Sequence, residues 1–195
     1  VMDQSTEKVV VRSSTILLRS ETQMSSSNGT SMMNMLRLSS QSLPTGAFSY
    51  SQGMEWLVDT KRIQDEETVY QWIASILYGP YANYELPILR TMLEAWRNSD
   101  HQILAELNQD YLITRETSEI QKETLQMGYA LKGIIQEMSI ISSHSTEFLM
   151  QLEYVTFPLG FSFCSFITDL SVEEMLTSHV LSLIHISEPT RQEAI

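Results

Sequence analysis

The stretch DEETVYQWIASIL, residues 65–77, decides the fold class. Asp65 stands in the N-cap position ahead of Glu66 and Glu67, whose negative charges favour the positive end of a helix dipole. The apolar residues recur on the 3.6-residue period of an α-helix: Val69, Trp72, Ile73, Ile76 and Leu77. The stretch therefore predicts a helix that buries one face.

Further helices follow along the chain. Gly79-Pro80 breaks or bends the first one, and Pro87 marks either another kink or an early helical turn before the apolar period resumes. Ser99 and Gln102 have the spacing of a capping box and predict a new helix start. Later helices are expected over residues 112–138, 146–155 and 171–180, the last opened by the capping box Ser171-x-x-Glu174.

Two glycines, Gly128 and Gly133, lie inside the helix predicted over residues 112–138. Because each costs a helix roughly 1 kcal/mol relative to alanine, we expect another helix to approach the backbone closely at both. Residues 157–161 are mostly apolar and rich in aromatic side chains, which suits a buried helix and would also allow a strand. Outside the N-terminal region no stretch alternates with period two, so we predict a single-domain, all-α helical bundle.

The composition of the chain excludes some functions. Its 195 residues suffice for one domain with a substantial core. The formal net charge of −12 opposes nucleic-acid binding, which requires clustered Lys and Arg. No apolar run of about 20 residues and no secretion signal occur, which predicts a cytoplasmic protein without a membrane span. The single cysteine, Cys164, is expected to be a small buried hydrophobe.

The two ends of the chain differ from its middle. Residues 1–31 show no sustained apolar period, and we interpret them as a disordered or non-native extension. Residues 181–195 begin LSLIHISEPTR, which matches the translation of a common transposase-type sequencing adapter; the alternative is a genuine short apolar element ending at Pro189. We interpret them as an adapter-derived tail, place the helical domain at residues 32–180 and leave His185 out of any metal-site argument.

The most specific motif precedes the helices, at residues 36–56, LRLSSQSLPTGAFSYSQGMEW. Here the chain closely resembles the urease accessory protein UreF family, whose members carry Leu-Pro-x-Gly-[Ala/Gly]-[Phe/Tyr]-Ser-x-Ser-x-Gly-x-Glu before their second helix. The resemblance continues through Arg115-Glu116-Thr117, at the start of a helix that reaches a glycine, here Gly128, and through TFPLG at residues 156–160. It spans residues 32–180.

The first part of this motif also has an interpretation from its residues alone. Pro44 fixes one φ angle, Gly46 permits a positive one and Phe48 supplies an apolar plug, so we expect a rigid turn pinned to a core. Ser49 or Ser51 is expected to cap the next helix. The structural positions of the family motif are predicted to be Pro44, Gly46, Phe48, Ser49, Gly53 and Gly128.

Four polar residues are candidates for a partner-binding surface. Gln52 and Glu55 are either solvated helix groups or the polar part of a partner-facing surface, which the resemblance implies for Glu55. Arg115 and Glu116 are adjacent, so on a helix their side chains would diverge by about 100°. Arg115 either forms a surface ion pair with Glu119, worth under about 1 kcal/mol, or joins Glu116 in a protein-binding face.

The sequence carries no clear signal for catalysis or metal binding. It has no GxxxxGK[ST] phosphate loop, so the chain is not expected to be a GTPase. His101, His144 and His179 have no second His or Cys at i+3 or i+4, and we expect them to be surface groups. Residues 160–164, GFSFC, match a nucleophile elbow only in part, because the second glycine is missing. We predict no enzyme activity, no cofactor and no metal site.

The resemblance implies an accessory function. It implies a protein that binds UreD, also called UreH, forms a homodimer when full length, recruits the GTPase UreG and docks on the urease apoprotein during nickel insertion. Family members continue through further helices, so we expect this chain to lack the family's C-terminal helices and to expose the apolar faces that pack on them. The alternatives are a helical interaction adaptor unrelated to urease, and a hydrolase using Ser162 or Glu55, for which no partner base stands out.

Overall fold

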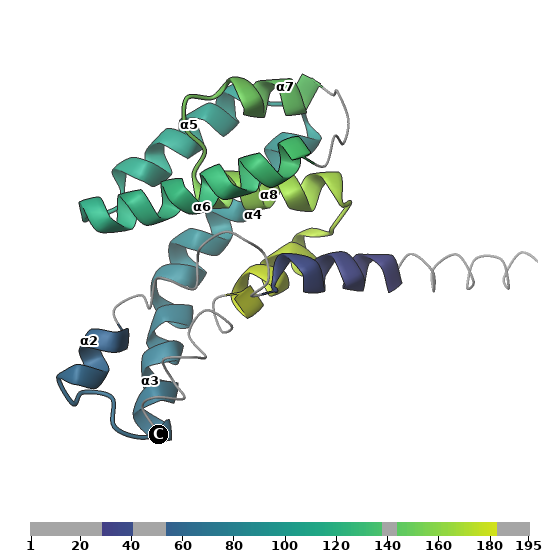
Figure 1. The fold of residues 1–195 in the computed structure, drawn as a ribbon. Coiled ribbons are helices and arrows are strands. Elements are labelled where there is room, and N and C mark those ends of the chain that lie inside the picture. Colours follow the sequence, from purple (N-terminus) through teal and green to yellow (C-terminus); the bar gives the residue numbers. More distant parts are fainter. Residues whose placement is uncertain (1–28, 41–53, 138–143, 183–195) are drawn as a thin grey trace, which may run out of the picture.

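The computed structural model describes residues 29–40, 54–137 and 144–182. Within these ranges every regular element is a helix and no strand occurs (Figure 1). The all-α prediction is therefore confirmed, because helical periodicity and the lack of period-two stretches had pointed to the same class. No helix in those ranges combines the length and the apolar character that a bilayer crossing requires.

A long bent rod follows the short helix α2 (Met54–Asp59). Three segments make up this rod: α3 (Glu66–Ile76), the π-helical segment η2 (Leu77–Glu85) and α4 (Leu86–Arg97). Asp65 caps α3 as predicted, because its carboxylate accepts a hydrogen bond from the backbone N–H of Thr68 at 2.9 Å. Val69 of α3 packs with Ile63 in a small separate core that residues of α2 help to cover.

The rod bends at Gly79-Pro80, as the sequence predicts. Gly79 has φ −89° and ψ −107°, outside the helical region, and Pro80 lies next to it inside η2. Proline lacks a backbone N–H and clashes with the preceding turn, and the wider π-type turn accommodates it. Pro87 lies in the first turn of α4, where the fixed φ angle of proline suits the helix. Of its two predicted roles, Pro87 therefore has that of an early helical turn.

The helices α5 (His101–Ile113) and α6 (Ser118–Glu137) depart from their predicted bounds. The capping box predicted at Ser99 is wrong: Ser99 has φ 55°, and Asp100 is the cap, accepting from the Ile103 N–H at 3.1 Å. The helix predicted over residues 112–138 is divided, because residues 112 and 113 end α5 and residues 114–117 connect the two helices.

The helix α8 (Phe157–Ile167) lies at the centre of the helical body. It contacts α4, α5 and α6, and its residues from Pro158 to Ser165 are all buried. The aromatic segment is therefore a buried helix and not a strand. The helix α7 (His144–Gln151) ends before residue 155, earlier than predicted.

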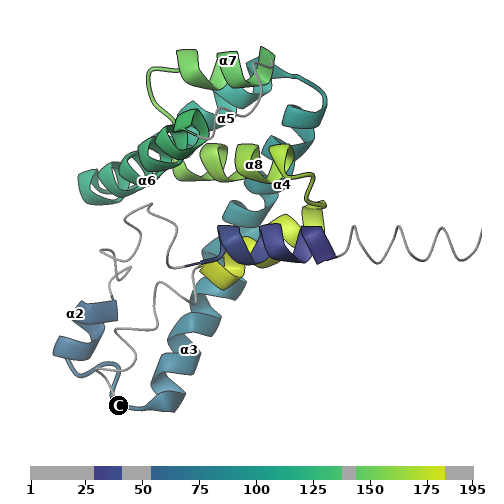
Figure 2. The same ribbon diagram turned by 45° about the vertical axis from the view of Figure 1, so that its right-hand side comes forward.

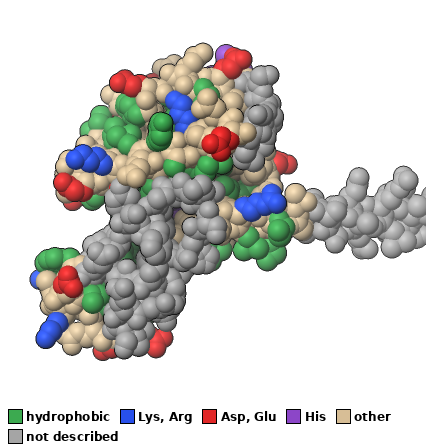
Figure 3. All heavy atoms as spheres, in the orientation of Figure 1, with side chains coloured by type: hydrophobic (Ala, Val, Ile, Leu, Met, Phe, Trp, Pro, Cys, Tyr) green, Lys and Arg blue, Asp and Glu red, His purple; other side chains and the backbone are tan. Residues whose placement is uncertain are grey.

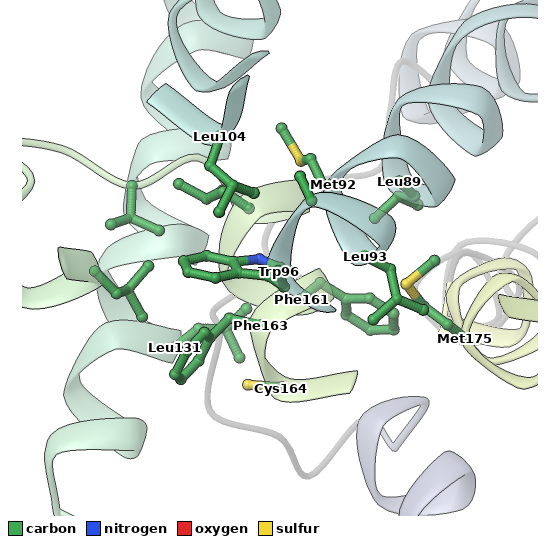
Figure 4. Close-up of a cluster of buried hydrophobic side chains, with 14 of the residues drawn as sticks. Leu89, Met92, Leu93, Trp96, Leu104, Leu131, Phe161, Phe163, Cys164 and Met175 are labelled. Carbon is green, nitrogen blue, oxygen red and sulfur yellow. The ribbon is translucent and has the colours of Figure 1, made fainter. Parts of the chain in front are cut away.

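Trp96 of α4 is the centre of the main core (Figure 4). Its ring is fully buried and meets Phe163 of α8 edge to face, with the ring centroids 4.8 Å apart. The indole N–H donates to Ser162 Oγ at 3.1 Å, which satisfies the polar atom of this large buried side chain. Cys164 lies in the same core as a free cysteine, which confirms its predicted role as a buried hydrophobe.

Two helices far apart in the sequence, over residues 29–38 and 172–182, lie side by side (Figure 2). Ser31 donates a hydrogen bond to Glu174, and the Ser178 hydroxyl donates to the Met35 carbonyl at 2.9 Å. The second helix opens with the predicted capping box, since the Ser171 N–H donates to the Glu174 carboxylate at 2.8 Å. The predicted domain limits at residues 32 and 180 both fall inside these helices.

Candidate functional site

Arg115, in the connection between α5 and α6, forms a compact polar cluster with α5 and η2. Its guanidinium lies 2.8 Å from the Glu85 carboxylate, and the Tyr111 hydroxyl donates to the same carboxylate oxygen at 3.0 Å. The guanidinium carbon also lies 4.2 Å from the centre of the Tyr111 ring and 5.3 Å from that of Tyr84. We call these four residues the Arg115 cluster. It ties η2 to the end of α5 across 30 residues of sequence.

The Arg115 cluster is an internal ion pair and not a surface one. The side chains of Arg115 and Glu85 are only 17% and 8% exposed. Burial raises the pKa of Glu85, and the positive charge of Arg115 together with the Tyr111 and Arg115 hydrogen bonds opposes that rise. The pKa of Tyr111 rises well above its ordinary value, first through burial and then through the charge of Glu85. Tyr111 therefore remains a hydrogen-bond donor at neutral pH.

The predicted pairing of Arg115 with Glu119 is wrong. Helix α6 begins only at Ser118, so Arg115 and Glu119 do not share a helix turn. The Glu119 carboxylate accepts instead from the Ser118 hydroxyl at 2.9 Å. Glu116, the next residue in the chain, is exposed. The fold therefore turns the side chain of Arg115 inward and leaves that of Glu116 at the surface.

A groove of about 450 Å³ lies between α4 and α5, next to the Arg115 cluster. Tyr84 and Thr114 belong to its wall and also join each other, with 2.8 Å between Tyr84 Oη and Thr114 Oγ1. Ile113, which is 66% exposed, lines it, and among the described residues of its lining Asp110 is the one with a charge. Figure 3 shows hydrophobic and acidic side chains together on the part of the molecule that α5 and α6 form. Such a groove suits a partner segment with apolar and basic side chains.

The segment that precedes α8 is held by buried polar contacts from α5. The side-chain oxygen of Asn108 accepts from the Thr156 N–H at 2.9 Å and from the Thr156 hydroxyl at 2.8 Å. The Asn108 amide donates to the Tyr154 carbonyl at 3.0 Å. On α6, Gly128 lets the backbone of Val155 approach, so the predicted close approach at this glycine is confirmed, although a connecting segment and not a helix makes it. The same prediction is wrong for Gly133, which faces open space.

The Arg115 cluster, the groove and the Asn108 anchor all lie in the part of the chain that matches a known family. The profile of the UreF family matches residues 63–185. The chain belongs to the UreF family. The match ends a few residues beyond residue 180, inside the predicted adapter-derived tail, and the origin of that tail stays a prediction.

Curated members of the UreF family resemble the chain over much of its length. The urease accessory protein UreF of Azoarcus sp. is 39% identical over 107 residues, which cover 55% of this chain and 46% of that protein. The UreF of Methylobacillus flagellatus is 31% identical over 169 residues, 87% of this chain and 74% of that protein. The UreF of Dechloromonas aromatica is 31% identical over 153 residues, 77% of this chain and 67% of that protein. These relatives are named accessory proteins, and the alternative of an unrelated helical adaptor is set aside.

Most residues of the UreF sequence motif lie outside the described residues. These are Pro44, Gly46, Phe48, Ser49, Gln52 and Gly53. Glu55 belongs to the backbone of α2, and its side chain is also outside the description. The partner-binding roles of Gln52 and Glu55 therefore stay predictions.

The prediction that His101, His144 and His179 are surface groups is confirmed for His144 and wrong for the other two. His179 is buried, stacks on Tyr81 and contacts Phe161 edge to face, and burial lowers its pKa to about 4. His101 is half-buried and stacks on Phe148 with the ring centroids 4.3 Å apart, whereas His144 is exposed. The isolation of these histidines in sequence gave no information about their packing.

Ser162, the serine of the partial nucleophile elbow, is part of the core. Its hydroxyl donates to the Leu159 carbonyl at 2.9 Å while accepting from Trp96. No histidine base contacts it among the described residues. Within the same ranges no group of three or more His, Cys, Asp or Glu side chains could hold a metal ion.

Of the four residues of the Arg115 cluster only Arg115 is a predicted site residue, and Glu85 is the charged member that sequence reasoning missed. One signal was available, because Glu85 is the only charged residue between Glu67 and Arg90. An isolated charge in an apolar and aromatic stretch indicates a buried carboxylate that needs a partner. Nothing in the sequence, however, indicates that the partner is Arg115.

Proposed function

We propose that this chain is a non-catalytic accessory subunit for urease. In this proposal it binds UreD/UreH, recruits the GTPase UreG and docks on the urease apoprotein in the cytoplasm during nickel insertion, with a homodimer as the state of the full-length protein. Membership of the UreF family supports the accessory role, and the relatives carry the name urease accessory protein. The buried position of Ser162 supports a role without bond-making chemistry.

The observation that carries the proposal is the exposed groove between α4 and α5. Its floor and walls are largely apolar, and Ile113 stays 66% exposed at its edge, an arrangement typical of a surface that a partner covers. The Arg115 cluster fixes Tyr84 on one wall, so the groove is preformed and little ordering entropy is lost on binding.

The charges around the groove favour a basic partner segment. Asp110 lines the groove and Glu116, two residues after Thr114, is exposed. The net charge of −12 adds a long-range attraction for positively charged surfaces. In this proposal Glu116 contributes to the partner-facing rim, whereas Arg115 shapes the groove from inside.

Co-purification tests the proposal directly. The full chain is co-expressed with UreD and UreG, and the complex is isolated through a tag on UreD. Ile113→Asp removes an apolar contact from the groove and should weaken the complex at least tenfold, because a carboxylate would have to be desolvated where the partner covers Ile113. Ile103→Asp, on the same helix and 40% exposed but outside the groove, is the matched control and should leave the complex intact.

The two possible failures have different meanings. A full chain that forms no complex with UreD or UreG would contradict the accessory function. A complex that tolerates Ile113→Asp as well as it tolerates Ile103→Asp would contradict the groove as the docking surface and leave the accessory function standing.

A further inference from the structure

Two histidines that are 43 residues apart in sequence meet at the starts of two helices. His101 is the first residue of α5, and His144 is the first residue of α7. Their ring centroids lie 4.9 Å apart and the ring planes are inclined by 44°. The fold therefore assembles an imidazole pair that no local sequence pattern announces.

Surrounding aromatic residues hold the His101 ring in place. It stacks on Phe148 with the planes 2° from parallel, and it lies edge-on to Trp96 of the main core. The Nε2 atom of His101 is buried, and it has no hydrogen-bond partner among the described residues. A buried imidazole nitrogen without a partner is costly unless something else binds it.

We propose that His101 and His144 bind one late first-row divalent cation, of the Zn²⁺, Ni²⁺ or Cu²⁺ class. Imidazole nitrogen is a preferred donor for these ions, whereas Mg²⁺ and Ca²⁺ prefer oxygen. Two imidazoles that share a cation at nitrogen distances of about 2.0–2.1 Å have ring centres roughly 4.5–5 Å apart, which fits the observed spacing.

The site is an open one. With two protein ligands, the remaining coordination positions are filled by water and stay available to a donor from another molecule. His144 is exposed, so one of the two ligands meets solvent, whereas the other, His101 Nε2, is buried. Because the ligands come from α5 and α7, a bound cation links these helices and should stabilise the folded state.

The test is a titration of the full chain with Zn²⁺ alone and with Ni²⁺ alone, by calorimetry in chelator-free buffer, with Mg²⁺ as the comparison ion. We expect one Zn²⁺ or Ni²⁺ per chain, no response to Mg²⁺, and a higher unfolding temperature with either bound ion. His144→Ala should weaken Zn²⁺ binding at least tenfold and abolish the rise in unfolding temperature. Its unfolding temperature without metal should match that of the wild type, because His144 is exposed.

Two further variants make the test specific. His101→Phe keeps an aromatic ring against Phe148 while removing both nitrogens, and it should lose the cation as His144→Ala does. His185→Ala removes a histidine outside the described residues and should bind like the wild type. The proposal is overturned if the wild-type chain binds neither ion, or if His144→Ala binds the ion as tightly as the wild type does. The groove and the partners of the proposed function play no part in this experiment, so either proposal can fail alone.

Discussion

Gly128 of α6 lies directly against the backbone of Val155: a side-chain carbon on Gly128 would be 1.9 Å from the Val155 carbonyl oxygen. The next atoms in reach would be backbone too, with the Val155 carbonyl carbon at 2.7 Å. No rotation of a flexible side chain could relieve this overlap. The segment in front of α8 is thus seated on α6 at a position where only glycine fits.

Gly128→Ala should therefore destabilise the protein by at least about 2 kcal/mol, because the backbone before α8 must move. Gly133→Ala is the matched control: it lies on the same helix, nothing stands within 4 Å of its added carbon, and alanine should stabilise the helix by about 0.5–1 kcal/mol. Urea unfolding of the three proteins measures both effects. Equal free energies of unfolding for the two variants would contradict the close contact.

Arg115→Met should lower the free energy of unfolding by about 3 kcal/mol at pH 7, because Glu85 would remain buried with no opposing charge. The double variant with Glu85→Gln should recover a large part of the loss, since neither partner is then an unpaired charge. A double-mutant cycle by urea unfolding measures this coupling. Strictly additive losses would show that the two side chains do not interact as described.

Features that depend on adjacent residues could be predicted from the sequence. Asp65 was identified as a cap from the acidic residues that follow it, and the bend at Gly79-Pro80 from the chemistry of proline. The capping box between Ser171 and Glu174 spans only one helical turn, so its spacing was enough. In each case the atoms that interact are fixed by local backbone geometry.

Features that depend on packing between distant segments could not be predicted. A surface pair with Glu119 is one of the two roles that the sequence predicts for Arg115, because Glu119 is four positions away, yet the fold brings Glu85 to it from 30 residues upstream. The pairing of His101 with His144 and the burial of His179 likewise follow from how α5, α7 and the helix over residues 172–182 are placed. Periodicity reveals which face of a helix is buried but not which residues meet there.

Glu123→Gln should stabilise the protein at alkaline pH. Burial raises the pKa of Glu123 from 4.5 to about 7, with a smaller opposing effect from Arg115. A raised carboxyl pKa means that the folded state holds the proton more tightly than the unfolded state does. The proton therefore stabilises the folded wild-type protein fully below pH 4.5, and this contribution to the free energy of unfolding is lost as the pH rises through 7.

At pH 8 the free energy of unfolding of Glu123→Gln should be about 1 kcal/mol higher than that of the wild type. This value is reduced for solvent screening because Glu123 is only partly buried. At pH 5 the difference should be smaller. Unfolding temperatures at both pH values provide the measurement. Glu116→Gln is the control at an exposed glutamate. An identical pH response of the Glu123 and Glu116 variants would count against a buried Glu123.

His179 should make the protein sensitive to mild acid. Its imidazole is fully buried among Tyr81, Phe157 and Phe161, and its Nδ1 has no hydrogen-bond partner among the described residues. Burial lowers the pKa from 6.5 to about 4. Below pH 6.5 the unfolded chain therefore takes up a proton that the folded chain does not, and stability falls as the pH drops toward 4.

The expected loss between pH 7.5 and pH 5 is about 2 kcal/mol from this group alone. His179→Phe keeps an aromatic ring in the cluster and removes the proton-binding nitrogens. Between pH 7.5 and pH 5 its free energy of unfolding should therefore fall by about 2 kcal/mol less than that of the wild type. The measurement is the change of the urea unfolding midpoint with pH in each protein. All other titrating groups are common to both proteins, and any cost of fitting the phenyl ring is the same at each pH, so a difference between the two slopes comes from His179. Parallel slopes for the two proteins would mean that His179 is protonated as readily in the folded chain as in the unfolded one, and hence that it is not enclosed by this aromatic cluster.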